Sequence, residues 1–235
     1  MLTCNLLVRF DGALVVRIFD DAAHAFRFEA VFRLEHRLKP ALISSERKPP
    51  LHFHPFQEEY VTALSGRVAV EVDGHVHLLE PQDGEFCIRP WQHHRFYPAP
   101  RPARDAHKDT VSESETRVLL TGQKTAEPFQ LDILFLDNWF NYQKSILLGE
   151  RKVSLIQVLA MFDGGGSYLS LPRWVPFGRW LSQALGIIVG RWIGAMLGYQ
   201  PFYREWSPDW RLACWKMSQS PLQRRFAKGN KAGME

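Results

Sequence analysis

Two histidines separated by one residue, followed closely by two glutamates, form the part of the sequence best suited to chemistry. The segment from Pro50 to Glu59 reads Pro-Leu-His-Phe-His-Pro-Phe-Gln-Glu-Glu. Side chains two residues apart on a β-strand point to the same face, so His52 and His54 can reach one point. Glu59 and a distant imidazole, for which His94 is the candidate, would complete a set of four ligands. Such a set suits one divalent transition metal ion, with Fe, Mn, Ni, Cu and Zn as candidates.

Two members of this set have neighbours that compete with them. Glu58 stands beside Glu59 and is a second candidate for ligation. Both glutamates are candidate catalytic residues, and Glu58 could move a proton. His93 competes with His94 in the same way. A further pair, His75-x-His77, lies on a predicted outer hairpin, where a solvated strand face explains it better than a second metal site.

Short runs of β-branched and aromatic residues, separated by Gly and Pro turns, fill the first half of the chain. Asp73-Gly74 is the strongest hairpin signal, because a tight primed turn needs positive φ. Strands at this short spacing favour an antiparallel barrel or sandwich over βαβ units. The predicted strands are 6–10, 13–19, 26–33, 59–72 with a break at Ser65-Gly66, 75–79, 85–88, 94–97, 116–121 and 129–136, and 98–114 is a predicted exposed loop.

The pattern becomes helical after Asp137, which is expected to cap a first helix. A second candidate helix covers 153–162 and is ended by three consecutive glycines. A third candidate helix begins near Pro176, because proline is tolerated in the first turn of a helix, and it runs to about residue 199. The sequence therefore predicts a β-barrel over 1–136 and a C-terminal helical extension over 137–235.

The spacing of the candidate ligands resembles the first signature motif of the cupin superfamily, Gly-x5-His-x-His-x(3,4)-Glu-x6-Gly. Glu46 replaces the leading glycine of that motif. The six residues that the motif requires before its second glycine favour Glu59 over Glu58. The matching positions are His52, His54, Glu59 and Gly66.

The second cupin motif, Gly-x5-Pro-x-Gly-x2-His, is matched more loosely. Counting back from His94 puts Trp91 at its second glycine and Arg89 at its proline. Gly84 and Pro90 each lie one residue away from the position that the motif gives them. The match favours the second histidine of the His-His pair as the ligand.

The resemblance implies a mainly β protein, namely a jelly-roll-like, single-domain cupin β-barrel followed here by a helical extension. The chain is similar to small cupin proteins of fungal biosynthetic gene clusters. That similarity implies a metal-dependent enzyme acting on a small organic substrate of secondary metabolism by dioxygenation, decarboxylation, isomerisation or cyclisation. The apolar, aromatic-rich helices indicate that this substrate is hydrophobic. A homodimer is also expected from the resemblance alone. The alternatives are a non-catalytic small-molecule-binding cupin module and a membrane-surface accessory protein.

Residues beside the ligands are candidates for a substrate pocket. Arg89 or Arg95 could bind a substrate carboxylate or enolate through paired donors. A salt bridge to a surface acid explains these arginines equally well. The pocket candidates are Tyr60, Arg89, Trp91, Gln92, Arg95 and Phe96.

Composition narrows the class of protein and its partners. With 46% hydrophobic and 13% aromatic residues the chain can form a real core, which argues against global disorder. The net charge of +4 is mild, and no helix patterned for base contacts is evident, so nucleic acid is not an expected partner. Three scattered cysteines and the absence of a signal-peptide pattern favour a reducing, cytoplasmic location.

A row of glycines marks the third predicted helix. The glycines recur every four residues and make a smooth face that another element can approach closely. Arg179 and Arg191 leave only eleven residues between them, fewer than the roughly 20 needed to span a bilayer. Two interpretations stay open: the helix packs on the barrel or on a second subunit, or segment 174–199 makes peripheral contact with a membrane through its aromatic residues. The glycines are Gly186, Gly190, Gly194 and Gly198.

Overall fold

The computed structural model describes residues 4–37, 48–99 and 114–228. Glu46 and most of the predicted 98–114 loop lie outside these described residues. Contacts between Cα atoms divide the chain into two compact units. The first unit contains residues 1–52 and 57–124, and the second contains 53–56 and 125–235.

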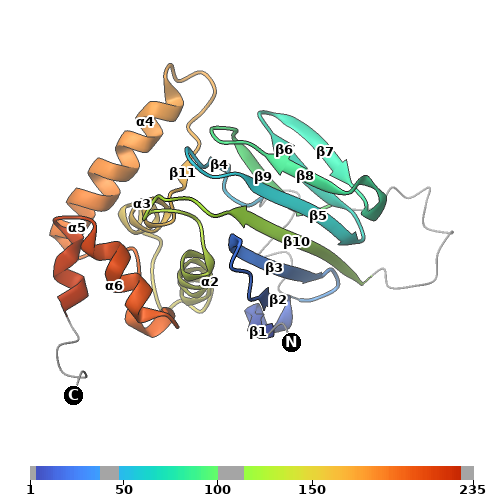
Figure 1. Ribbon diagram of the computed structural model, residues 1–235, viewed down its shortest axis with the longest axis horizontal. Helices are drawn as coiled ribbons and strands as arrows, with labels where there is room; N and C mark the ends of the chain where they lie inside the picture. Colours follow the sequence, from blue (N-terminus) through green and yellow to red (C-terminus); the bar gives the residue numbers. More distant parts are fainter. Residues whose placement is uncertain (1–3, 38–47, 100–113, 229–235) are drawn as a thin grey trace. The chain divides into compact units, whose positions relative to one another are not determined.

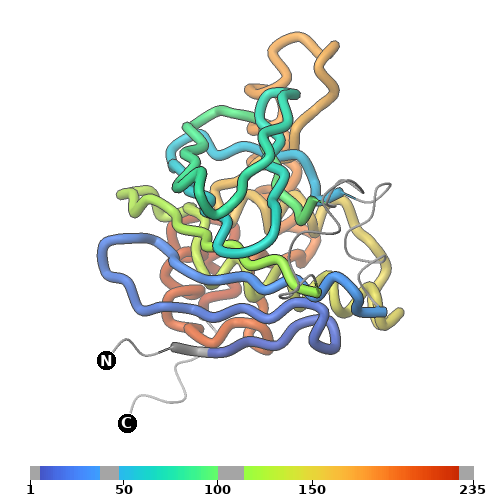
Figure 2. Tube along the Cα trace, turned by 90° about the vertical axis from the view of Figure 1, so that its right-hand side faces the viewer, coloured from blue at the N-terminus to red at the C-terminus, as the bar shows by residue number. Residues whose placement is uncertain are grey.

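The first unit is built from two antiparallel sheets, as the alternating pattern predicts (Figure 1). One sheet has six strands in the order β1-β2-β3-β10-β5-β8, and the other contains β4-β9-β6-β7. The first three strands form a meander whose segments run side by side (Figure 2). The strands are β1 (Cys4–Arg9), β2 (Leu14–Phe19), β3 (His24–Arg33), β4 (His52–Phe53), β5 (Glu59–Ser65), β6 (Val68–Val72), β7 (His75–Leu79), β8 (Glu85–Ile88), β9 (His94–Pro98) and β10 (Glu115–Gln123).

The predicted hairpin at Asp73-Gly74 is confirmed. Both residues have positive φ, 46° and 86°, and they join β6 to β7 with Val72 opposite His75. Gly66 also has positive φ, 71°, and separates β5 from β6, at the break that the sequence predicts. These turns fix which side chains face the core, because a shift of one residue would turn every side chain to the other face.

One predicted strand is wrong. Residues 129–136 were expected to form the last strand, but α2 (Ile133–Leu147) begins within them. Asp132 caps this helix, and its side chain accepts a hydrogen bond from the backbone N–H of Phe135. Asp137, the expected cap, lies inside the helix and is buried. A short apolar run cannot be assigned to a strand or a helix by periodicity alone, and here the capping aspartate decides.

The second unit is mainly helical, so the fold class is confirmed: two antiparallel sheets come first and a helical region follows. Within this unit, which includes Phe53 at the end of β4, the ring of Tyr168 in β11 (Tyr168–Leu169) lies 5.8 Å from the Phe53 ring. The helices are α2, α3 (Leu155–Gly164), α4 (Gly178–Leu185), the π-helical segment η4 (Gly186–Ile193), α5 (Gly194–Leu197) and α6 (Trp210–Ser218) (Figure 1). Turns of 3₁₀-helix cover Phe10–Gly12, Pro81–Asp83, Arg204–Trp206 and Gln223–Lys228.

Three glycines of the row have the close-approach role that the sequence predicts: Gly190 and Gly194 approach α3, Gly186 approaches Tyr168, and Gly198 has no atom within 4 Å of an added Cβ. A Cβ added at Gly190 would lie 2.6 Å from the backbone carbon of Leu159, and one at Gly186 would lie 2.7 Å from the Tyr168 ring. The bulky apolar side chains of the same segment are exposed, among them Phe177, Ile188 and Trp192. Gly178–Leu197 is long and apolar enough to cross a membrane by length and composition alone, and 28% of its apolar 18-residue window is buried. Membrane contact through 174–199 therefore stays a prediction.

Replacing Gly190 by alanine is expected to lower the free energy of unfolding by about 1–3 kcal/mol, because backbone atoms of α3 occupy the space of the new methyl group. Urea denaturation followed by circular dichroism would measure the change. Gly178→Ala is the matched control, since its Cβ would meet Leu171 at an ordinary 3.8 Å. Equal stability of the two variants would contradict close packing at Gly190.

Candidate metal centre

Three strand ends bring the four candidate ligands together. His52 lies in β4 and pairs in register with His94, the first residue of β9. Glu59 is the first residue of β5, and His54 follows β4 directly. On β9, Phe96 lies on the same face as His94, and both stand opposite valines of β6. Residues that are 42 positions apart in sequence, such as His52 and His94, thus become direct neighbours through strand pairing.

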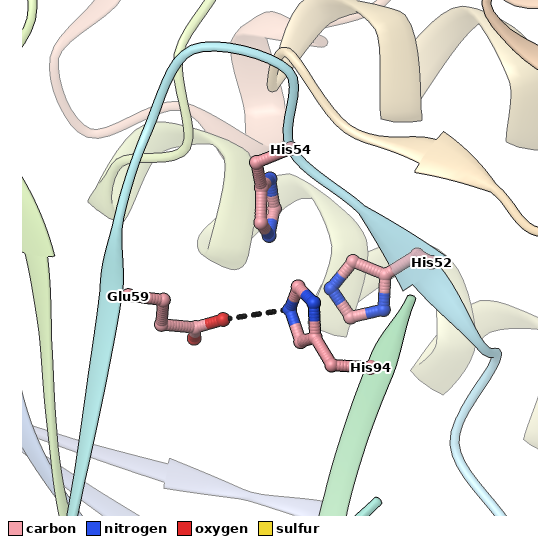
Figure 3. Close-up of side chains that lie close together, drawn as sticks. All are labelled: His52, His54, Glu59 and His94. Carbon is pink, nitrogen blue, oxygen red and sulfur yellow. Dashed lines mark hydrogen bonds and ion pairs between the residues drawn. The ribbon is translucent and has the colours of Figure 1, made fainter. Parts of the chain in front are cut away.

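The four side chains point toward one another (Figure 3). One potential ligand atom from each lies within 4.8 Å of the others. His94 is fully buried, His54 and Glu59 are 2% and 4% exposed, and His52 is half-buried. The rings of His52 and His94 are 4.4 Å apart between centroids. The cluster is therefore partly exposed to solvent at His52, whereas its other three side chains are buried.

Backbone carbonyl groups determine how two of the imidazoles are protonated. The Nδ1 atom of His52 lies 3.0 Å from the carbonyl oxygen of Pro50, and the Nδ1 atom of His94 lies 2.9 Å from that of Gln92. A carbonyl oxygen can only accept a hydrogen bond, so each Nδ1 carries the hydrogen. In the neutral rings the lone pair is then on Nε2, the tautomer suited to binding a metal ion.

The contact between His94 and Glu59 shows that the donor set fits a cation. His94 Nε2 lies 3.0 Å from Oε2 of Glu59. A ring lone pair and a carboxylate oxygen repel each other at this distance unless a proton or a metal ion is shared between them. Three imidazoles and one carboxylate suit Fe, Mn, Ni, Cu or Zn, and the residues present therefore fit one such ion.

The cluster contains Glu59 and His94, and their competing neighbours have other contacts. Glu58 is half-exposed and accepts a hydrogen bond of 2.5 Å from the Tyr60 hydroxyl, which raises the pKa of Tyr60 to about 12. The backbone of His93 is bound on both sides to Asp73: its N–H donates to Oδ1, and its carbonyl accepts from the Asp73 N–H. Catalytic roles for Glu58 and Glu59 remain predictions.

The predicted pocket residues divide into two groups. Arg95 is on the opposite face of β9 from His94, and Glu71 holds its guanidinium through two hydrogen bonds of 2.8 and 2.9 Å. Arg89 is exposed, and its backbone N–H is bound by the side chain of Gln92 in the turn before β9. Trp91 occupies that same turn with positive φ, 68°. Substrate contact by these residues, by Phe96 and by Tyr60 remains a prediction.

Sequence reasoning missed one residue that touches the cluster. The hydroxyl of Ser167, after α3, lies 3.0 Å from Nδ1 of His54, and the two residues are 113 positions apart. No motif or periodicity connects them. Only the end of α3, which the three glycines before Ser167 mark in the sequence, indicated a sharp turn in this segment.

No protein-family model matches the chain. Among solved structures, Pac13, described as a nucleoside dehydratase, aligns at 9% identity over 52% of this chain and 81% of its own, with a TM-score of 0.32. The Fe(II) form of HppE aligns at 12% identity over 51% of this chain and 56% of its own, with a TM-score of 0.34. These likenesses are too weak to bear on the fold, which rests on the strand order and registers of the chain itself.

Curated relatives are much more similar. An oxidoreductase of Arthrobotrys oligospora is 40% identical over 224 residues, which covers 95% of this chain and 85% of the relative. The probable oxidoreductase yanE of Aspergillus niger is also 40% identical, over 94% of this chain and 83% of its own length. Epoxidase atD of Aspergillus terreus is 36% identical over 81% of this chain and 58% of its own. The chain belongs to the family of fungal oxidoreductases that these relatives represent.

Proposed function

We propose that this chain is a metal-dependent oxidoreductase of the cupin type, and that His52, His54, Glu59 and His94 hold its metal ion. The observation that carries the proposal is the convergence of four potential ligand atoms within 4.8 Å, three of them on residues that are almost fully buried. Burying two imidazoles and a carboxylate together is unfavourable without a compensating charge. A divalent ion supplies that charge.

Two backbone conformations support the cupin assignment. Gly66 has a φ of 71°, at the closing glycine of the first motif. Trp91 has a φ of 68°, at the position where the second motif has a glycine. Positive φ is rare outside glycine, so the turn before β9 keeps the conformation that the motif requires although its glycine is absent. This agreement supports the alignment that makes His94 the fourth ligand.

The names of the relatives favour oxidation among the reactions that the sequence left open. Relatives are named oxidoreductases, and one is named an epoxidase, which favours oxidative chemistry over decarboxylation, isomerisation or cyclisation. A bound redox-active ion such as iron would supply electron transfer or activation of dioxygen at the site. We infer that the substrate is a small organic molecule of fungal secondary metabolism.

The residues around the cluster support an apolar substrate. Val72, Val70 and Phe96 continue the face of the sheet on which His94 lies, and both valines are buried. Such a surface binds a hydrophobic substrate and excludes water, while Glu59 brings the negative charge that balances the ion. The half-buried His52 is then on the side from which a substrate approaches.

Elemental mass spectrometry of the protein, purified without added metal or chelator, tests the proposal. We expect about one transition metal ion per chain, and its loss in His52→Ala. Oxygen consumption with candidate hydrophobic substrates then separates an enzyme from a non-catalytic binding module. A wild-type protein that stays free of metal after reconstitution would contradict the metal-dependent function.

Size-exclusion chromatography with light scattering would test the predicted homodimer, and flotation with liposomes would test the predicted peripheral membrane contact. The exposed rings of Trp174 and Phe177, each 82% exposed, are the observation that keeps membrane contact open. Fractionation of fungal cells would test the predicted cytoplasmic location.

A further inference from the structure

Ser167 makes a buried hydrogen bond to one of the four candidate ligands. Its Oγ atom lies 3.0 Å from Nδ1 of His54. Ser167 is 1% exposed and His54 is 2% exposed, so water does not compete for this contact. A buried hydrogen bond of this length restricts the rotation of the imidazole ring.

A second contact gives the direction of this hydrogen bond. Ser167 Oγ also lies 3.3 Å from the carbonyl oxygen of Gly165, which can only accept. A hydroxyl group has a single hydrogen, and the carbonyl of Gly165 competes with His54 for it. The geometry favours the arrangement that uses both contacts: Ser167 Oγ donates to Gly165 and accepts from His54, whose ring hydrogen is then on Nδ1.

We propose that Ser167 is a positioning residue that holds His54 in the Nδ1–H tautomer and turns its Nε2 lone pair toward the metal ion. This inference rests on the proposed function. All three imidazoles then carry their ring hydrogen on Nδ1, since backbone carbonyl groups accept a hydrogen bond from Nδ1 of His52 and of His94. Ser167 differs from those two partners because it acts through a side chain, so a substitution can remove it.

The turn after α3 holds the hydroxyl of Ser167 in place. The Ser167 N–H donates to the carbonyl of Phe162 at 2.9 Å. Gly166 has a φ of 61°, and a Cβ there would lie 2.2 Å from the carbonyl oxygen of Phe129. On either side of this turn, the Tyr168 hydroxyl donates to Asp163 at 3.2 Å. The backbone of Ser167 is therefore fixed, and its hydroxyl stays within hydrogen-bonding distance of His54.

The test compares Ser167→Ala with Ser220→Ala, a matched control at a second serine that is 1% exposed in the helical part of the chain. Zinc(II) affinity is measured by competition with a chromophoric chelator. We expect Ser167→Ala to bind zinc about 10–100-fold more weakly than wild type, the range typical of losing a hydrogen-bond partner of a metal ligand. Ser220→Ala should bind it as wild type does, and Ser167→Thr, which keeps the hydroxyl, should recover most of the affinity.

A second measurement does not depend on metal. Long-range ¹H–¹⁵N NMR of the metal-free protein reports which ring nitrogen of His54 carries the hydrogen, with the signals assigned by their loss in His54→Gln. We expect the Nδ1–H tautomer in wild type and a mixture of tautomers in Ser167→Ala. If Ser167→Ala does not fold, Ser167→Cys, with a weaker hydrogen-bonding group, takes its place.

The outcomes separate this inference from the proposed function. Unchanged zinc affinity and an unchanged His54 tautomer in the variant would overturn the role of Ser167 and leave the metal site intact. A second outcome is that the wild-type protein binds no zinc, while His54 is in the Nδ1–H tautomer in wild type and loses it in Ser167→Ala. This result would support the positioning role and contradict the proposed function. An Nε2–H tautomer in metal-free wild type would overturn the inference directly.

Discussion

Glu59→Gln is expected to abolish stoichiometric metal binding, whereas Glu58→Gln leaves it unchanged. Glu59 is the single anionic member of the cluster, and glutamine keeps its shape while removing the charge. The loss of metal affinity should exceed the roughly 10–100-fold typical of losing an outer hydrogen-bond partner. Isothermal titration with the metal found in the wild-type protein measures the affinity of both variants.

Thermal unfolding gives an independent check of the Glu59 prediction. A metal ion that binds only the folded chain stabilises it by about 2.7 kcal/mol when its free concentration is 100 times the Kd. The melting temperature of wild type and of Glu58→Gln should therefore rise when metal is added, and that of Glu59→Gln should not. Metal-free Glu59→Gln should be at least as stable as metal-free wild type, because a buried carboxylate is replaced by a neutral amide.

Because Glu58 and Glu59 are adjacent, Glu58→Gln is a closely matched control for Glu59→Gln. Both variants carry the same chemical change one residue apart, at Glu59, the first residue of β5, and at the residue just before it. Glu58 has its own partner, the Tyr60 hydroxyl, so its replacement changes a local contact without touching the cluster. Equal loss of metal in both variants, or retention in both, would contradict the assignment of Glu59 as the ligand.

The ligand set could be predicted from the sequence because three of its members lie within eight residues and obey strand geometry. His52 and His54 are two residues apart, and Glu59 opens the next strand. The fourth member, His94, needed the motif spacing, since strand pairing alone does not choose between two adjacent histidines. Ser167 could not be predicted, because a contact across 113 residues depends on where the chain folds back.

The same reasoning explains which elements were predicted correctly. The Asp73-Gly74 hairpin was predictable because its backbone conformation is encoded in two adjacent residues. The expected strand at 129–136 failed because the run contains both strand-forming residues and an N-cap, Asp132. The hydrogen bond from the Phe135 N–H to the Asp132 side chain decides this case in favour of the helix. The boundary between the barrel and the helical extension, at residue 136, remains a prediction.

Arg191→Met is expected to destabilise the fold by about 3–5 kcal/mol at neutral pH, because it leaves a buried carboxylate without its cation. Asp163 is fully buried, and the Arg191 guanidinium holds it through two hydrogen bonds of 2.7 and 2.8 Å. The same guanidinium lies 4.0 Å from the centre of the Phe129 ring. Arg191, which interrupts the apolar segment in the sequence, is thus the residue that ties η4 to α3.

The pH dependence of this variant follows from the protonation of Asp163. Burial raises the pKa of Asp163 above its usual 3.8, and the contacts with Arg191 and Tyr168 offset part of that rise. Without Arg191 the pKa of Asp163 must rise further, so the folded variant binds a proton that the unfolded chain releases above about pH 4. Its free energy of unfolding should therefore increase as the pH falls from neutral toward the unfolded pKa, and the deficit relative to wild type should shrink.

Urea denaturation at pH 7 and at pH 5, followed by circular dichroism, measures this deficit. The double variant Asp163→Asn/Arg191→Met is the decisive control, since it removes the buried charge together with its partner. We expect it to recover much of the stability lost in Arg191→Met, because a buried ion pair contributes less to stability than the loss of one partner implies. A pH-independent deficit that the double variant does not reduce would mean that Arg191 stabilises the fold through packing on Phe129, and not through Asp163.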